Sequence, residues 1–164
     1  MPGTRLFPVA NLTSGRAFVA MDRLLDQARC GPVYLKQPEI AQVVVDSVEH
    51  GVELGHYDLH AWVVMPNHVH LLLTPAVSIS KLMGSLKTAS AIRANAFLNR
   101  SGQPFWQEES FDRVVRDDDE FRRTLRYIET NPVVAGLAEN AGGYRWSSAG
   151  ATRVVAAARV AALR

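Results

Sequence analysis

Several features of secreted and membrane proteins are missing from this sequence of 164 residues. Its one cysteine, Cys30, can form no internal disulfide and belongs to no cysteine-rich zinc pattern. No run of about 18 apolar residues is present, which argues against a membrane-spanning helix. The first residues lack the apolar segment that a signal peptide needs. We therefore expect a cytoplasmic protein with no membrane partner.

A strong overall charge is also missing. The net charge is +2 at pH 7, and 48% of the residues are hydrophobic, which suits a folded globule. The charges are unevenly distributed, because residues 1–80 hold 5 basic and 7 acidic side chains, whereas residues 81–164 hold 13 and 9. Of the 18 basic residues 15 are arginine, whose planar guanidinium matches phosphate. A GC-rich genome is the alternative explanation for this excess.

Two histidines separated by one valine, His68 and His70, lie in a segment that is typical of a β-hairpin. Apolar residues over 59–65 and 69–73 predict two strands, and a Pro-Asn pair at 66–67 predicts the turn. Because side chains alternate along a strand, both histidines should share one face. Val69, Leu71 and Leu73 should point into a core on the other. Two imidazoles on one face form half of a metal site, and a pair of surface histidines is the alternative.

Apolar spacing predicts helices on both sides of this hairpin. The first runs from Pro38 to His50, and the second begins at Ser80 as its N-cap, runs to about Leu98 and ends before a Ser-Gly pair at 101–102. The inward stripe of the first helix is Ile40, Val43, Val44, Ser47 and Val48. The inward residues of the second are Leu82, Met83, Leu86, Ala89, Ile92 and Phe97.

The remaining segments are less regular. Phe105–Trp106 and Phe111–Val115 are rich in strand-forming residues and predict short strands around an acidic turn. Before Pro38 we find a short apolar stretch over 6–9 and a possible helix over 17–28, but no clean β-strand. Residues 150–164 form an alanine-rich tail.

A third helix is expected over about residues 118–131, and four acidic residues at its start suit the helix dipole. Its buried stripe comprises Phe121, Leu125 and Ile128. Tyr127 and Asn131 are one turn apart and flank this stripe, with Arg123 on the same side and Arg122 and Arg126 toward solvent. Pro132 predicts that Asn131 ends the helix. A boundary aromatic and a helix stop are the structural alternatives for these two residues.

These motifs together resemble a known family. The segments Met65–Leu73, Phe105–Trp106, Phe111–Arg113, Tyr127–Leu137 and Tyr144–Ser148 are similar to the REP-associated tyrosine transposases, which are IS200-like, single-tyrosine members of the HUH nuclease superfamily. The resemblance covers about residues 38–149 of one domain that we expect to span residues 1–149. It implies an α+β, ferredoxin-like antiparallel sheet with helices packed on it. The family's usual N-terminal strand has no clean counterpart here; either residues 6–12 or Phe18–Val19 replace it, or it is missing.

The resemblance also implies a reaction. Tyr127 would be the nucleophile, and His68, His70 and Asn131 would bind a divalent metal, Mg²⁺ or Mn²⁺. The enzyme would cleave and rejoin single-stranded DNA near palindromic hairpins through a 5′-phosphotyrosine intermediate, as a monomer or a homodimer. Candidates for contacts with the DNA backbone are Lys87, Arg122, Arg123 and Arg126.

Two other functions remain open at the level of the sequence. A metal-dependent hydrolase could use the histidines with water as the nucleophile and would not need Tyr127. A domesticated DNA-binding protein could keep the fold without cleaving. A covalent protein–DNA adduct would distinguish the transposase from both.

Overall fold

The central feature of the fold is a four-stranded antiparallel sheet. In a computed structural model, which describes residues 18–21, 32–106 and 112–151, its strands are β1 (Phe18–Met21), β2 (Tyr57–Val64), β3 (Val69–Pro75) and β4 (Asp112–Val115). Their order across the sheet is β2-β3-β1-β4. Helix α1 (Pro38–Glu53) connects β1 to β2, and helix α2 (Ile79–Phe97) connects β3 to β4. This β-α-β-β-α-β order is the ferredoxin-like arrangement, which confirms the expected fold class.

Strand β1 corrects one expectation about the N-terminal part and confirms another, that Phe18–Val19 supply the N-terminal strand. A helix over 17–28 is wrong for residues 18–21, which pair with β3 and β4, so the N-terminal strand is present. Val19, for example, lies between Leu73 of β3 and Val114 of β4. Pairing on both sides outweighs a weak local preference for helix. The alternative candidate for this strand, residues 6–12, lies outside the described residues.

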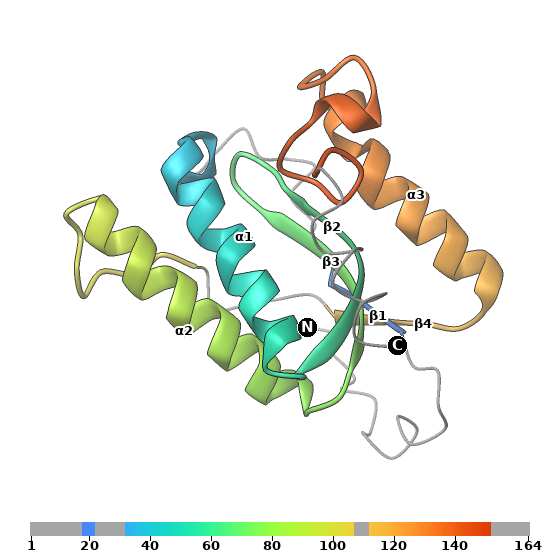
Figure 1. The fold of residues 1–164 in the computed structure, drawn as a ribbon, viewed down its shortest axis with the longest axis horizontal. Coiled ribbons are helices and arrows are strands. Elements are labelled where there is room, and N and C mark those ends of the chain that lie inside the picture. Colours follow the sequence, from blue (N-terminus) through green and yellow to red (C-terminus); the bar gives the residue numbers. More distant parts are fainter. Residues whose placement is uncertain (1–17, 22–31, 107–111, 152–164) are drawn as a thin grey trace, which may run out of the picture.

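Helix α1 forms as its sequence predicts and runs three residues beyond His50. Pro38 stands in its first turn, where a missing N–H costs nothing, and Gly55, with a φ of 67°, follows its end. It packs against one face of the sheet beside α2 (Figure 1). The expected stripe is buried there: Ile40, Val43, Val44, Ser47 and Val48.

Helix α2 differs from its prediction in its cap and in its buried face. The N-cap is Ser78, not Ser80, and its hydroxyl accepts from the backbone N–H of Lys81. Leu82 is buried as expected, but Ala89, Ile92 and Phe97 are exposed. Small and polar residues replace them on the inner face: Ser90, Ala94 and Asn95. Ser90 and Asn95 are buried there because they bond to the loop that follows the helix.

The segment after α2 is a loop, so the strand expected at Phe105–Trp106 is wrong. Asn99 and Gly102, with φ values of 52° and 81°, turn the chain back along the helix. The indole Nε1–H of Trp106 then donates to the hydroxyl of Ser90, at 2.8 Å. This bond fixes the loop on α2. The acidic turn expected at 108–110 lies outside the described residues.

Helix α3 (Asp118–Val134) covers the opposite face of the sheet from α1 and α2 (Figure 1). Asp117 caps it, because its carboxylate accepts from the backbone N–H of Glu120, at 2.7 Å. The expected end at Asn131 is wrong, since the helix continues through the buried Pro132 to Val134. A proline removes one helical hydrogen bond, and the packing of the last turn outweighs that loss. Gly136, with a φ of 71°, follows the helix end.

The chain after α3 returns to the free edge of β2. Ser147 forms a bridge with Val63, the N–H of Val64 donates to the carbonyl of Trp146, and the N–H of Ser148 donates to that of Trp62. Residues 146–148 therefore cover this edge of the sheet, which gives the Trp-Ser-Ser motif a structural role. No helix within the described ranges is long and apolar enough to cross a membrane.

Candidate functional site

The two histidines lie on the face of the sheet that α3 covers. His70 is in β3 and pairs with Val63, whereas His68 directly precedes the strand. The backbone N–H of Met65 donates to the carbonyl of His68, at 2.8 Å, and closes the hairpin turn. On the other face, Leu71 and Leu73 pack into the core formed with α1 and α2. The alternation of side chains expected from the sequence is therefore present.

The two imidazoles are buried and converge. Relative exposure is 7% for His68 and 2% for His70, and their rings meet edge to face with centroids 4.7 Å apart. Their Nε2 atoms are 3.0 Å apart. This is hydrogen-bond distance, and which Nε2 donates depends on the tautomers of the two rings. A buried pair of this kind differs from the surface histidines that were the structural alternative.

Asn67 determines which nitrogen of His68 carries the proton. Its amide oxygen lies 2.7 Å from Nδ1 of His68. An amide oxygen only accepts, so Nδ1 donates and the lone pair of the ring is on Nε2, which faces His70. The sequence pattern indicates only a turn residue at Asn67. Its position directly before the first histidine was the available signal for this second role.

Tyr127 is brought to the histidine pair by the packing of α3. Ile128, 2% exposed, anchors the middle of the helix on the sheet. Its neighbour Tyr127 lies at the margin, and its ring meets that of His70 edge to face, with centroids 5.6 Å apart. The side chain is 41% exposed, so a large substrate can reach it. Residues 57 positions apart in the sequence thus form one site within a single chain.

Asn131 lies one helical turn beyond Tyr127, about 5.4 Å along the axis. It is buried at 9% exposure. Together with Thr124 and Ile128 it belongs to the buried side of α3, which faces β2 and β3. The amide of Asn131 is therefore on the side of α3 that faces the sheet, as the two histidines are on the face of the sheet that α3 covers.

The donor set is compatible with a metal ion, which the family resemblance implies. Two ligands in adjacent octahedral positions, each about 2.1 Å from the ion, are about 3.0 Å apart. The Nε2 atoms of His68 and His70 have this separation. No group of three or more His, Cys, Asp or Glu side chains that could hold a metal occurs within residues 18–21, 32–106 and 112–151.

A second contact that the sequence analysis missed fixes the first half of α3. His60 stands at an irregularity in the β2–β3 pairing between Leu59 and Ala61. Its Nε2 lies 2.8 Å from the hydroxyl of Thr74, and its ring meets that of Phe121 edge to face at 5.3 Å. A bulge re-aims one side chain of a strand, and here it directs a histidine toward α3.

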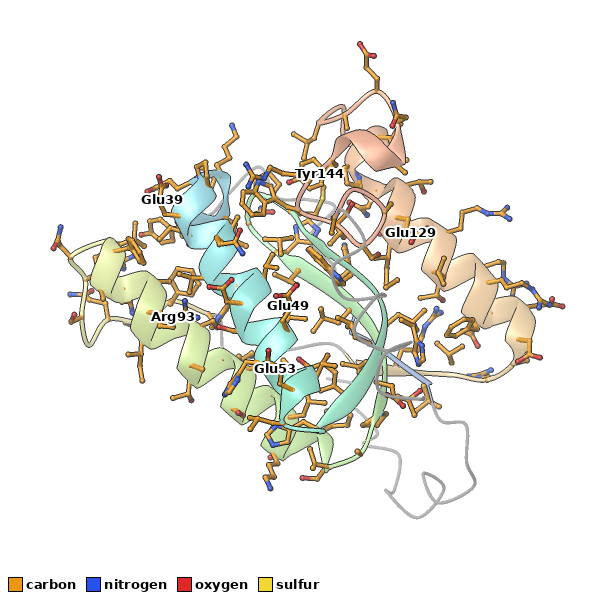
Figure 2. The ribbon with its side chains drawn as sticks, viewed as in Figure 1. Glu39, Glu49, Glu53, Arg93, Glu129 and Tyr144 are labelled. Atoms are coloured by element: carbon orange, nitrogen blue, oxygen red, sulfur yellow. The ribbon has the colours of Figure 1, made fainter. Side chains whose placement is uncertain are left out.

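The second half of α3 is tied to the segment that covers β2. The hydroxyl of Ser148 accepts from the N–H of Trp62, at 3.1 Å. Its one proton has two acceptors in reach, the carbonyl of Trp62 at 3.3 Å and the carboxylate of Glu129 at 3.4 Å. The hydroxyl of Tyr144 donates to the carbonyl of Val64, at 2.9 Å, and its burial raises the pKa of Tyr144. Glu129 and Tyr144 are labelled in Figure 2. These bonds fix α3, and with it Tyr127, relative to the histidine hairpin.

Of the four cations predicted to contact DNA, the structure places three together. Arg122, Arg123 and Arg126 are exposed on the helix that carries Tyr127. Arg122 donates to the carboxylate of Asp119, at 2.5 Å, and this pair lowers the pKa of Asp119. Lys87 is on α2, on the other side of the sheet. It is therefore not part of the same surface.

Comparison with known proteins agrees with the fold and the motifs. The family model described as "Transposase IS200 like" matches residues 34–131, a range that contains His68, His70, Tyr127 and Asn131. The chain therefore belongs to the IS200-like transposase family, whose members are DNA-processing enzymes.

One solved structure shares the fold at low sequence identity. It is described as the structure of a REP-associated tyrosine transposase bound to a REP hairpin, with a TM-score of 0.56 and 18% identity over 80% of this chain and 74% of that one. A comparison with curated proteins gives no significant match.

Proposed function

We propose that the protein cleaves and rejoins single-stranded DNA, with Tyr127 as the nucleophile. The observation that carries the proposal is the contact between the rings of Tyr127 and His70, beside a buried pair of imidazoles. Neither a water-dependent hydrolase nor a protein that only binds DNA needs a partly exposed tyrosine at this position. Membership of the transposase family gives the reaction class.

A tyrosine hydroxyl has an ordinary pKa of about 10 and attacks an anionic phosphodiester poorly without help. A divalent cation, Mg²⁺ or Mn²⁺, would be held by the Nε2 atoms of His68 and His70 and the amide oxygen of Asn131, and when bound it would neutralise charge on the scissile phosphate. Asn67 holds His68 in the tautomer that leaves Nε2 able to coordinate. The fixed position of α3 holds the ring of Tyr127 beside that of His70.

The bonds made and broken define the products. The hydroxyl of Tyr127 loses its proton as its oxygen bonds to phosphorus, the bond from phosphorus to the 3′-oxygen breaks, and that oxygen takes up a proton. The products are a 5′-phosphotyrosine and a free 3′-hydroxyl. Because one phosphodiester replaces another, a 3′-hydroxyl can reverse the step and join strands without ATP.

The DNA substrate would be a hairpin with single-stranded flanks. The related structure holds a REP hairpin, and the exposed arginines of α3 supply positive charge beside Tyr127. Arg123 and Arg126 lie on its solvent side and suit contacts to the DNA backbone.

A covalent adduct on a denaturing gel tests the proposal. Wild-type protein, a labelled DNA hairpin with single-stranded flanks and Mn²⁺ should give a protein-shifted band that survives denaturation. Tyr127→Phe should lose this band completely and still bind the DNA, because only the hydroxyl is removed. Tyr57→Phe is the matched control and should keep the band, since that hydroxyl bonds to the carbonyl of Val48 in α1, away from the histidines.

Two results would contradict the assignment. Cleavage without any adduct would indicate a hydrolase in which water is the nucleophile. Binding of the hairpin with no cleavage under any divalent metal would indicate a DNA-binding protein that has lost the reaction.

A further inference from the structure

We propose that a cluster of Tyr34, Arg100 and Phe105, here called the aromatic platform, binds a base of the single strand that flanks the cleavage site. The inference rests on the proposed function and adds a binding site on a different part of the surface. The platform lies on the α1/α2 side of the sheet, where η2 (Tyr34–Lys36) and the loop after α2 meet.

The chemistry of the platform suits a nucleobase. The rings of Tyr34 and Phe105 are stacked, with centroids 6.0 Å apart and planes 20° apart. The guanidinium of Arg100 lies 4.9 Å from the centre of the Tyr34 ring and also donates to its hydroxyl. All three side chains are partly exposed. Stacked aromatic rings with an arginine form the usual platform for single-stranded nucleic acid, because every base has a π-face.

The loop that carries Arg100 and Phe105 is held in place by its own contacts. The buried amide of Asn95 donates to the carbonyl of Gln103, at 2.6 Å, and the backbone carbonyl of Asn95 accepts from the N–H of Arg100, at 2.8 Å. Trp106 is bonded to Ser90 of α2. A preorganised surface loses little conformational entropy when it binds a ligand.

The platform is connected to the site through the hairpin turn. The N–H of Leu35, the residue after Tyr34, donates to the carbonyl of Pro66, at 3.1 Å. Pro66 lies two residues before His68 in the same turn. In Figure 1 the start of α1 and the tip of the β2–β3 hairpin lie at the same end of the molecule. A single DNA strand that runs from the histidines across this turn therefore reaches the platform.

The surface around the platform carries a net positive charge, which suits the negatively charged backbone of a DNA strand. Within residues 32–39 and 95–106, the basic side chains are Lys36 and Arg100, and the only acid is Glu39. Arginine lies directly on the ring stack, where a base and its phosphate would both contact it.

Binding by the non-cleaving Tyr127→Phe protein tests the platform apart from the reaction. The probe is a labelled DNA hairpin with and without a single-stranded flank of about ten nucleotides, followed by fluorescence anisotropy. Tyr34→Ala and Arg100→Ala should each weaken binding of the flanked hairpin by on the order of tenfold, since one stacked base contributes about 1–3 kcal/mol. Binding of the hairpin without a flank should stay unchanged.

Two exposed residues of α2 serve as matched controls. Phe97, at 61% exposure, and Arg93, which pairs with Asp46 and is labelled in Figure 2, lie outside the platform. Phe97→Ala and Arg93→Ala should leave both affinities unchanged. Equal losses in the controls and in the platform variants would overturn the proposal.

Photo-crosslinking keeps the test valid if a platform variant fails to fold. A flank that carries 5-iodouracil at each position in turn should crosslink to the peptide of Tyr34 or Phe105 in the Tyr127→Phe protein. Crosslinks at no position, or only to other peptides, would overturn the platform. A wild-type protein that crosslinks there but forms no covalent adduct would overturn the proposed reaction and leave the platform intact.

Discussion

Asn67 is a residue whose effect on the site depends on one hydrogen bond. The bond to Nδ1 fixes the tautomer of His68 and turns Nε2 toward His70. Partners of this kind typically change metal affinity by about 10–100-fold. Asn67→Ala should therefore weaken Mn²⁺ binding by roughly this factor, measured by titration calorimetry. Asn67→Asp keeps an acceptor and should retain most of the affinity. Equal affinities in all three proteins would show that the bond does not orient the ligand.

Tyr57 provides a residue-scale prediction about pH. Burial raises its pKa to about 12, and its hydroxyl donates to the carbonyl of Val48, at 2.7 Å. In the unfolded chain the pKa is about 10, so between about pH 10 and pH 12 the folded state keeps a proton that the unfolded state has lost. The free energy of unfolding should therefore fall as the pH rises through this range.

Removal of the Tyr57 hydroxyl should make the free energy of unfolding depend less on pH in this range. Tyr57→Phe should cost about 1 kcal/mol at neutral pH, because one buried hydrogen bond is lost. Between about pH 10 and pH 12 it should lose less stability than the wild type does. Urea unfolding at several pH values measures this effect. Parallel curves for the two proteins would mean that Tyr57 titrates normally.

At the scale of elements, helix α3 carries three exposed arginines, of which only Arg122 forms an ion pair with a neighbour on the same helix. Arg123 and Arg126 are exposed, whereas Arg122 is paired with Asp119. Each phosphate contact to single-stranded DNA contributes about 0.7 to the slope of log affinity against log salt. Arg123→Ala and Arg126→Ala should each reduce the slope by about this amount.

Two variants control for a general loss of positive charge. Arg122→Ala removes a cation that already has a partner, and Lys87→Ala removes one from the other side of the sheet. Both should change the slope less than the other two variants do. A uniform decrease in all four would indicate a response to net charge alone.

Comparison of elements shows what the sequence could predict. The hairpin, α1 and the start of α3 have strong periodic and capping signals and form where expected. The inner face of α2 was mispredicted because Ile92 and Phe97 are apolar and yet exposed, while Ser90 and Asn95 are buried. Hydrophobicity alone cannot indicate that the hydroxyl of Ser90 accepts a hydrogen bond from the indole of Trp106. Strand β1 was only one of the alternatives that the sequence left open, since its two neighbours are what make it a strand.

At the scale of the whole molecule, the contact between Tyr127 and His70 joins residues of the same chain. Tyr127→Phe and His70→Ala should therefore remain inactive when the two purified proteins are mixed. An enzyme that exchanged its tyrosine between subunits would regain activity in the mixture, because some dimers would contain one intact site. The yield of covalent adduct measures the difference. Recovery of the adduct would show that the active unit combines two chains.

The candidate site shows the limit of sequence reasoning at this scale. The common face of the two histidines follows from the period of a strand. Their contact with Tyr127 does not, because it requires α3 to cover the face that α1 and α2 leave open. The contacts that hold α3 there, between Glu129 and Ser148 and between the rings of His60 and Phe121, join residues with no recognisable pattern.

Residues 146–148 have a consequence for how copies of this protein behave toward one another. A bare edge strand exposes a row of backbone donors and acceptors and invites other strands to pair with it. Here Trp146 and Ser148 already hold the backbone of β2, and the opposite edge strand, β4, is only four residues long. Loss of the chain from Tyr144 onward would therefore yield a protein that self-associates through its sheet, even where Tyr127 and the histidines are intact.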